Sequence, residues 1–168
     1  ALLDVSDSIA TFYQLIITRT PRPIYSYEVI KSNTTGRIIV NATTKPDLVK
    51  MWYAHTLSKT LRDFRLVRCD SIPDCIQPVL WFSEVLHENP VGSGIYIAEM
   101  DAPEEGWTGF LIELTYIYPD IRTLRVTSEV NIVPDIMPFP PCGNHCQSME
   151  PIYTPENLPP LKPVVINN

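Results

Sequence analysis

Apolar and polar residues alternate one by one through much of the chain between Ile24 and Val133. The alternation is clearest in segments 108–117 and 123–132. One side of these segments carries Phe110, Ile112, Leu114, Tyr116, Leu124, Val126, Ser128, Val130 and Ile132. Because successive side chains of a strand point to opposite faces, this period of two predicts strands with one buried and one solvated face.

Similar patterns recur along the chain, with turn residues between them. The predicted strands are 24–31, 36–43, 48–56, 63–68, 78–86, 94–100, 108–117 and 123–132. Glycines and prolines punctuate these segments, and we interpret Gly36 as one of the turn residues. Seven or eight short antiparallel strands at this spacing predict a β-sandwich of immunoglobulin or fibronectin type III style. Trp52, on the third strand, is expected to fill the space between the two sheets.

The segment 4–18 precedes the strands and has the pattern of a helix. Ile9, Phe12, Leu15 and Ile16 recur at helical spacing and form one apolar stripe. Pro21 and Pro23 are expected to end the helix. A single short helix is marginal in water, so its stripe needs another surface to pack on.

The segment 134–168 follows the strands and holds nine of the 17 prolines. Proline fixes φ and cannot donate to a strand ladder, so we expect an extended, irregular tail. Its apolar residues favour a strap on another surface, while a disordered tail is the alternative.

Composition excludes some classes of protein and favours secretion. The net charge of −6 is spread without long basic runs, so no nucleic-acid footprint is visible. No apolar run reaches the roughly 20 residues that span a bilayer. Asn33 and Asn41 begin Asn-X-Thr sequons. On strand 36–43 the alternation places Asn41 outside, where it suits a glycan.

The four cysteines form two closely spaced pairs. Cys69 and Cys75 flank one loop, and Cys142 and Cys146 flank another. Two local disulfides are the simplest interpretation, and cross-pairing is possible because four cysteines allow three connectivities. A metal site that adds His145 to the second pair is the alternative. Zinc sites usually separate paired cysteines by two residues, and the second pair has three between them. Disulfides, like the sequons, favour an oxidising compartment.

No complete catalytic motif stands in the sequence. It contains no nucleophile elbow, no zinc-protease motif, no P-loop and no dinucleotide fingerprint, and we predict no catalytic residue, metal or cofactor. Arg62, Asp63 and Arg65 are the charged cluster of interest. They can form bidentate ion pairs that fix a loop or grip a neighbouring domain, and a site for a substrate carboxylate is the alternative.

Three segments together resemble a known protein family. They read MWYAHTLSKTLRDFR at 51–65, GWTGFLIELTY at 106–116 and TSEVNIVPDIMPF at 127–139. Near the start, SIATFYQLII followed by PRPIYSYEV fits as well. In order and spacing, residues 5–140 resemble the C-terminal region of the PhoPQ-activated pathogenicity-related protein and autocrine proliferation repressor family. The CGNHC tail has no counterpart in that pattern.

The resemblance implies a division of the chain into three parts. Residues 1–22 would be a helix of an upstream α/β-hydrolase-like domain, 23–133 an immunoglobulin-like β-sandwich and 134–168 a proline-rich tail. The nucleophile, acid and histidine of the hydrolase-like domain would lie upstream of Ala1, so none is carried over to this chain.

The resemblance also implies a role. We expect a secreted, non-catalytic part that packs on the hydrolase-like domain of its own precursor. Its expected interface residues are Phe12, Leu15, Ile16, Arg62, Asp63 and Arg65. An enzyme subunit that completes an active site in trans is one alternative, a freestanding immunoglobulin-like recognition or adhesion module is another, and homo-oligomers are possible.

The cysteine spacing generates a first prediction. Thiol labelling of the native protein under denaturing, non-reducing conditions is expected to give no signal, because all four thiols are oxidised. Intact mass after labelling measures this directly. Stoichiometric zinc, with four reactive thiols after chelation, would contradict the prediction.

Overall fold

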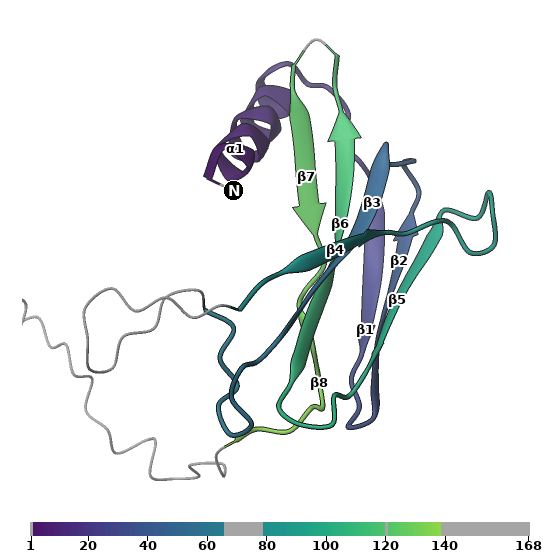
Figure 1. The fold of residues 1–168 in the computed structure, drawn as a ribbon. Helices are drawn as coiled ribbons and strands as arrows, with labels where there is room; N and C mark the ends of the chain where they lie inside the picture. Colours follow the sequence, from purple (N-terminus) through teal and green to yellow (C-terminus); the bar gives the residue numbers. More distant parts are fainter. Residues whose placement is uncertain (1, 66–78, 120, 139–168) are drawn as a thin grey trace, which may run out of the picture. The chain divides into compact units, whose positions relative to one another are not determined.

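The computed structural model describes residues 2–65, 79–119 and 121–138 (Figure 1). These residues belong to one compact unit, Ala1–Pro138. Its elements are α1 (Leu2–Ile17), β1 (Tyr25–Ile30), β2 (Thr35–Ala42), β3 (Leu48–His55), β4 (Phe82–Val85), β5 (Ile95–Asp101), β6 (Thr108–Ile117), β7 (Thr123–Thr127) and β8 (Asn131–Val133).

The strands form two antiparallel sheets. The first has the order β1-β2-β5, and the second has the order β4-β3-β6-β7, with β8 also paired to β6. The predicted mainly β fold with one preceding helix is therefore confirmed at this level. The predicted strand 63–68 is not seen over 63–65, which are irregular, and its remainder lies outside the described residues.

The core lies between the two sheets, where their inner faces meet. The first sheet contributes Ile38, Val40, Ala42, Tyr96 and Ala98, and the second contributes Val49, Met51, Phe110, Ile112, Leu114, Tyr116, Leu124 and Val133. The predicted inward faces of 36–43 and 108–117 are confirmed by this burial. At about 25 cal/mol per Å² of apolar surface, such burial is the main source of stability.

The predicted strand 123–132 is two strands. Ser128 interrupts the ladder, because its hydroxyl accepts from the N–H of Ile112 at 3.0 Å while its own N–H donates to the Ile112 carbonyl at 2.8 Å. After this break the alternation changes phase. Asn131 and Val133 are buried, whereas Val130 is exposed. The prediction that Val130 and Ile132 continue the inward side was wrong.

Trp52 does not lie between the sheets. The buried residues that β3 contributes to the core between the sheets are Val49 and Met51, and Trp52 has the opposite parity. It pairs with Leu111 of β6 and Ser83 of β4 on the outer face of the second sheet. The prediction of a central tryptophan was wrong, because β3 carries large side chains on both faces and its own pattern does not select one.

Gly36 is a buried strand residue rather than a turn residue. A Cβ at this position would lie 2.9 Å from Asn131 Nδ2 and 3.0 Å from Phe110 Cε1. The Asn131 amide donates to the carbonyls of Ile30 and Arg37 at 2.9 and 3.2 Å, and so ties β8 to the β1–β2 hairpin. Glycine is needed because two buried side chains of the second sheet press against the backbone of the first.

Helix α1 packs on β7 through polar atoms. The hydroxyl of Thr11 donates to the Thr123 carbonyl at 3.2 Å, and the N–H of Arg125 donates to the Ser8 hydroxyl at 3.1 Å. β7 ends its sheet, so these backbone groups lie on its side away from β6. The helix thereby covers a sheet edge that would otherwise present unpaired groups.

The helix ends through its own backbone. The N–H of Thr20 bonds to the Leu15 carbonyl at 3.0 Å, and that of Arg19 bonds to the Ile16 carbonyl at 3.2 Å. Arg19 has a φ of 54°, which completes a Schellman motif with arginine at the left-handed position. The predicted breakers Pro21 and Pro23 therefore follow a helix that has already stopped.

Gly36→Ala is expected to lower the free energy of unfolding by about 1–3 kcal/mol, because the new methyl overlaps the Phe110 ring and the Asn131 amide. Denaturant unfolding measures the change. Ser26→Ala, at an exposed position of the same sheet, serves as control and should stay within about 0.5 kcal/mol. Equal stability of the two variants would contradict the close packing at Gly36.

Thr11→Val is expected to cost about 1–3 kcal/mol, because it leaves the Thr123 carbonyl without its donor at a fully buried position. The same unfolding assay applies. Thr18→Val, at the exposed end of the helix, is the matched control with an expected change under about 0.5 kcal/mol. An unchanged Thr11→Val would show that the helix is not held on β7 by this bond.

Candidate functional site

Helix α1 carries an apolar face that no described residue covers. We call this face the outer stripe, and it consists of Val5, Ile9, Phe12, Tyr13, Ile16 and Ile17. Their side chains are between 44% and 66% exposed. Residues of a helix follow at about 100° intervals, so these six share one broad face. The outer stripe lies beside the packing face of Ser8, Thr11 and Leu15.

The predicted helix stripe is therefore divided between two surroundings. Ile9, Phe12 and Ile16 are exposed as expected, but Leu15 is fully buried in the core. The expectation that the helix exposes Leu15 was wrong. Val5, Tyr13 and Ile17 were missed, although they continue the same helical spacing and could have been found by extending the pattern to both ends.

A hollow of about 460 Å³ adjoins the outer stripe. Phe12 of the helix forms one wall, and β7 contributes Leu124 and Val126. The connector after the helix and the start of β1 complete it with Arg22, Pro23, Ile24 and Tyr25. The Arg22 guanidinium lies 5.8 Å from the centre of the Phe12 ring, within cation–π range. The hollow offers an apolar recess next to an apolar ridge.

The charged residues of the sequence make local contacts in the loop after β3. Asp63 accepts from Arg65 Nε at 2.9 Å and from Nη2 at 2.8 Å, a bidentate pair. Arg62 Nη1 reaches the Ile136 carbonyl at 3.5 Å and the Met137 sulfur at 3.3 Å. These contacts fix the loop after β3 to the segment after β8. The predicted interface role of these residues stays a prediction.

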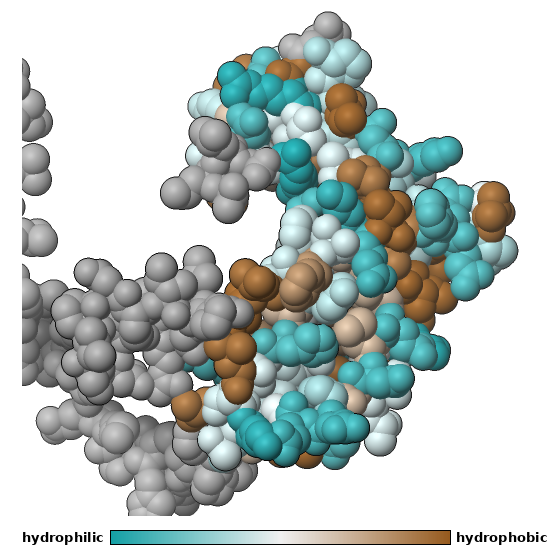
Figure 2. Space-filling model, viewed as in Figure 1, coloured by the Kyte–Doolittle hydropathy of each residue, from teal (hydrophilic) through white to brown (hydrophobic). Residues whose placement is uncertain are grey.

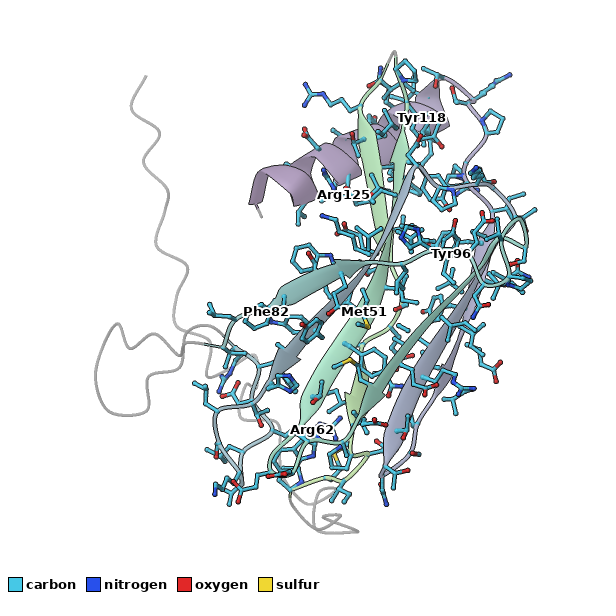
Figure 3. All side chains as sticks on the ribbon, turned by 45° about the vertical axis from the view of Figure 1, so that its right-hand side comes forward. Met51, Arg62, Phe82, Tyr96, Tyr118 and Arg125 are labelled. Carbon is cyan, nitrogen blue, oxygen red and sulfur yellow. The ribbon has the colours of Figure 1, made fainter. Side chains whose placement is uncertain are left out.

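We call the loop after β3 that carries Arg62, Asp63 and Arg65 the charged loop. It lies at the opposite end of the sheets from helix α1. Figure 3 places Arg62 at one end and Tyr118 near the helix at the other. The register agrees, because His55 at the end of β3 pairs with Thr108, whereas Ile117 pairs with Thr123 beside the helix. We expected Arg62 and Arg65 near the same junction as the helix, and within this unit they are not.

The ring of Phe64 packs against β6 and so fixes the course of the charged loop. A Cβ on Gly109 would lie 3.1 Å from the Phe64 ring, so the glycine leaves room for the ring on the outer face of β6. Phe64 also contacts Trp81, with ring centres 6.1 Å apart. Nearby, Trp107 donates its indole N–H to the Ile136 carbonyl at 3.0 Å. The three segments that carry the family resemblance therefore meet at one end of the unit.

The predicted glycosylation residues are both on the surface. Asn33 lies in the hairpin between β1 and β2, and Asn41 lies on β2 facing away from the core. Both side chains are exposed. The geometry leaves room for a glycan at either position, and occupancy stays a prediction.

The predicted cysteine sites fall outside the described residues, as does His145. Among the residues that the structure does describe, no three His, Cys, Asp or Glu side chains are arranged to hold a metal ion. In the same residues, no helix has the length and hydropathy of a membrane span.

The inner tyrosines are structural rather than chemically poised. Burial, with smaller contributions from neighbouring tyrosines, raises the pKa of Tyr116 to about 12. Its hydroxyl donates to the Thr44 carbonyl at 3.4 Å. Burial, with a contribution from Glu88, also raises the pKa of Tyr96. Both phenols are therefore neutral at physiological pH.

Comparisons with known proteins agree with the resemblance seen in the sequence. Residues 2–65 match the model of the PhoPQ-activated pathogenicity-related protein family. The chain is 36% identical over 153 residues to autocrine proliferation repressor protein A of Dictyostelium discoideum. That match covers 85% of this chain and 31% of the relative, so the chain spans about a third of the relative's length.

No solved structure matches the chain significantly. The family match runs from α1 through β3 to the end of the charged loop at Arg65. The resemblance of this chain to the PhoPQ-activated pathogenicity-related protein family is therefore confirmed.

Proposed function

We propose that this chain is the non-catalytic C-terminal β-sandwich part of a secreted protein of the autocrine repressor type, and that it packs on an α/β-hydrolase-like domain. The observation that carries the proposal is the outer stripe of α1. Six exposed apolar side chains on one helix face are unusual for a free surface, and such patches generally mark interfaces.

The outer stripe has the composition of an interface core. It combines aliphatic side chains with the aromatic rings of Phe12 and Tyr13 and contains no charged residue. The hollow beside Phe12 adds a recess into which a partner side chain would fit. The outer stripe and the hollow together favour a packed protein partner over a small polar ligand.

The length of the relative is compatible with a partner domain in the same precursor. Since the match covers 31% of that protein, more than half of its length lies outside the matched part. A segment of that size is large enough for a further domain of the same precursor. We therefore place the hydrolase-like domain, and any catalytic residues, in that part.

The pairing of the strands supports the finer description of the fold. Strand orders β1-β2-β5 and β4-β3-β6-β7 correspond to A-B-E and C′-C-F-G of an immunoglobulin or fibronectin type III sandwich. Such sandwiches commonly serve as recognition or structural modules. The exposed sequons at Asn33 and Asn41 support secretion.

The contacts of the charged loop weigh against completion of an active site in trans. The Asp63 carboxylate is bound by Arg65, and Arg62 holds a backbone carbonyl. Groups engaged in this way anchor a loop.

Ile16→Asp is expected to weaken association with the separately produced remainder of the precursor by about 2 kcal/mol or more, because it places a charge in the centre of the outer stripe. Isothermal titration calorimetry measures the dissociation constants. Gln14→Asp is the matched control, since it makes the same change on the polar side of the same helix, and should bind like the unmodified chain.

Two results would contradict the proposal. One is equal binding by Ile16→Asp and the unmodified chain. The other is a stable monomer that associates with no part of its precursor, which would favour the freestanding recognition module.

A further inference from the structure

A second surface of different chemistry lies on the outer face of the second sheet. It is a shallow pocket of about 250 Å³ lined by Trp52, Trp81, Leu111, Glu113 and Thr127. The contacts that hold α1 on β7 do not involve these side chains. The pocket ends on β7 at Thr127, whereas the helix bonds to Thr123 and Arg125.

Register and packing place these side chains together. Trp52 is opposite Leu111 in the β3–β6 ladder, and Glu113 is opposite Thr127 in the β6–β7 ladder. Trp81 comes from the segment before β4 and contacts the Phe64 ring. The pocket wall is therefore assembled from four parts of the chain and supported from one side by the charged loop.

The pocket combines aromatic faces with polar groups. Trp52 and Trp81 supply two indoles, Leu111 supplies an apolar floor, and Glu113 and Thr127 supply hydrogen-bonding oxygens. Trp81 is 36% exposed. The ammonium of Lys50 lies 5.7 Å from the centre of the Trp52 ring, which helps to fix that ring.

One polar atom of this wall is unsatisfied. The indole N–H of Trp52 is buried and finds no acceptor within the described part of the chain. A buried donor without a partner costs free energy. Because this N–H is covered, the polar groups that the pocket offers to a ligand are the Glu113 carboxylate and the Thr127 hydroxyl, which lie beside the two aromatic rings.

We infer that this pocket binds a carbohydrate ring. A pyranose has a face of C–H groups that packs on an aromatic ring and a rim of hydroxyls that bond to groups such as Glu113 and Thr127. A purely apolar ligand would leave the Glu113 carboxylate and the Thr127 hydroxyl without hydrogen-bond partners. A cavity of about 150 Å³ holds a benzene ring, so this pocket has room for one saturated six-membered ring.

The partner of this surface differs from that of α1. The outer stripe has no charged residue and suits a packed protein surface, whereas the pocket pairs aromatic rings with a carboxylate and a hydroxyl. Apolar side chains also gather near β4 beside it (Figure 2), where Leu80 and Val85 are exposed. These give a longer saccharide further surface to contact.

The experiment titrates the whole chain with glucose, galactose, mannose, N-acetylglucosamine and their short oligomers, with tryptophan emission and NMR as readouts. Trp107 is buried and outside the pocket, so its signals should stay unchanged. At least one of these sugars is expected to bind saturably in the millimolar range, because the pocket is shallow and holds a single ring.

Two variants with matched controls locate the site. Trp81→Ala and Glu113→Gln are each expected to weaken the sugar's binding at least tenfold. Phe82→Ala removes an exposed aromatic ring of opposite strand parity, and Glu28→Gln removes an exposed carboxylate from the first sheet. Both controls should bind as the unmodified chain does. Thermal unfolding confirms that all four variants are folded, and Thr127→Ala replaces Trp81→Ala if that variant does not fold.

Three outcomes would overturn the inference. The first is the absence of saturable binding by every sugar tested. The second is binding that Trp81→Ala and Glu113→Gln leave unchanged, which would place it elsewhere. The third is a chain that binds no sugar but loses association with its precursor on Glu113→Gln, which would make this face a protein interface.

Discussion

The open edge of β7 is the constraint on which the arrangement of this unit depends. A strand at the end of a sheet presents N–H and C=O groups that need partners, and α1 supplies hydroxyls from Ser8 and Thr11. Because the side of the helix with these hydroxyls and with Leu15 is needed there, the other apolar side chains of the helix are turned outward. The surface that we assign to a protein partner therefore follows from a hydrogen-bonding requirement of the sheet.

The opposite end of the sheets depends on a different kind of contact. Gly109 admits the Phe64 ring against β6, and the Asp63–Arg65 pair holds the loop in place. Arg62 and Trp107 both bond to the Ile136 carbonyl, which ties the segment after β8 to this end. The charged residues near Arg62 thus help to hold the loop after β3 to the segment after β8. The three segments that carry the family resemblance meet at this end of the unit.

The two ends leave the outer face of the second sheet between them. Trp52 and Trp81 lie there because β3 carries bulky side chains on both faces and its inner positions are taken by Val49 and Met51. If the proposed precursor domain packs on the helix end, this face remains open to a ligand. This division fits a module that packs on a protein partner through α1 and binds a ligand on the outer face of the second sheet.

The sequence by itself predicted most of the strands, an arrangement in two sheets and the buried side of the segments 36–43 and 108–117. A period of two predicts which side chains of one strand share a face. Ile38 on β2 and Ile112 on β6 are buried as this pattern predicts. It also indicated the exposure of Asn41 and, in Ile9, Phe12 and Ile16, part of the outer stripe.

Only the tertiary structure decided which face of each ambiguous element is buried. Trp52 lies on the outer face of its sheet, and Leu15 lies in the core. Gly36 is a strand residue, and it is glycine because Phe110 and Asn131 press against the backbone there. Local periodicity shows how side chains are arranged around the axis of one helix or strand. It does not show which groups the neighbouring element needs for hydrogen bonds and packing. For α1 the edge of β7 needed hydroxyl groups, so the face with Ser8, Thr11 and Leu15 was buried and the outer stripe was left exposed.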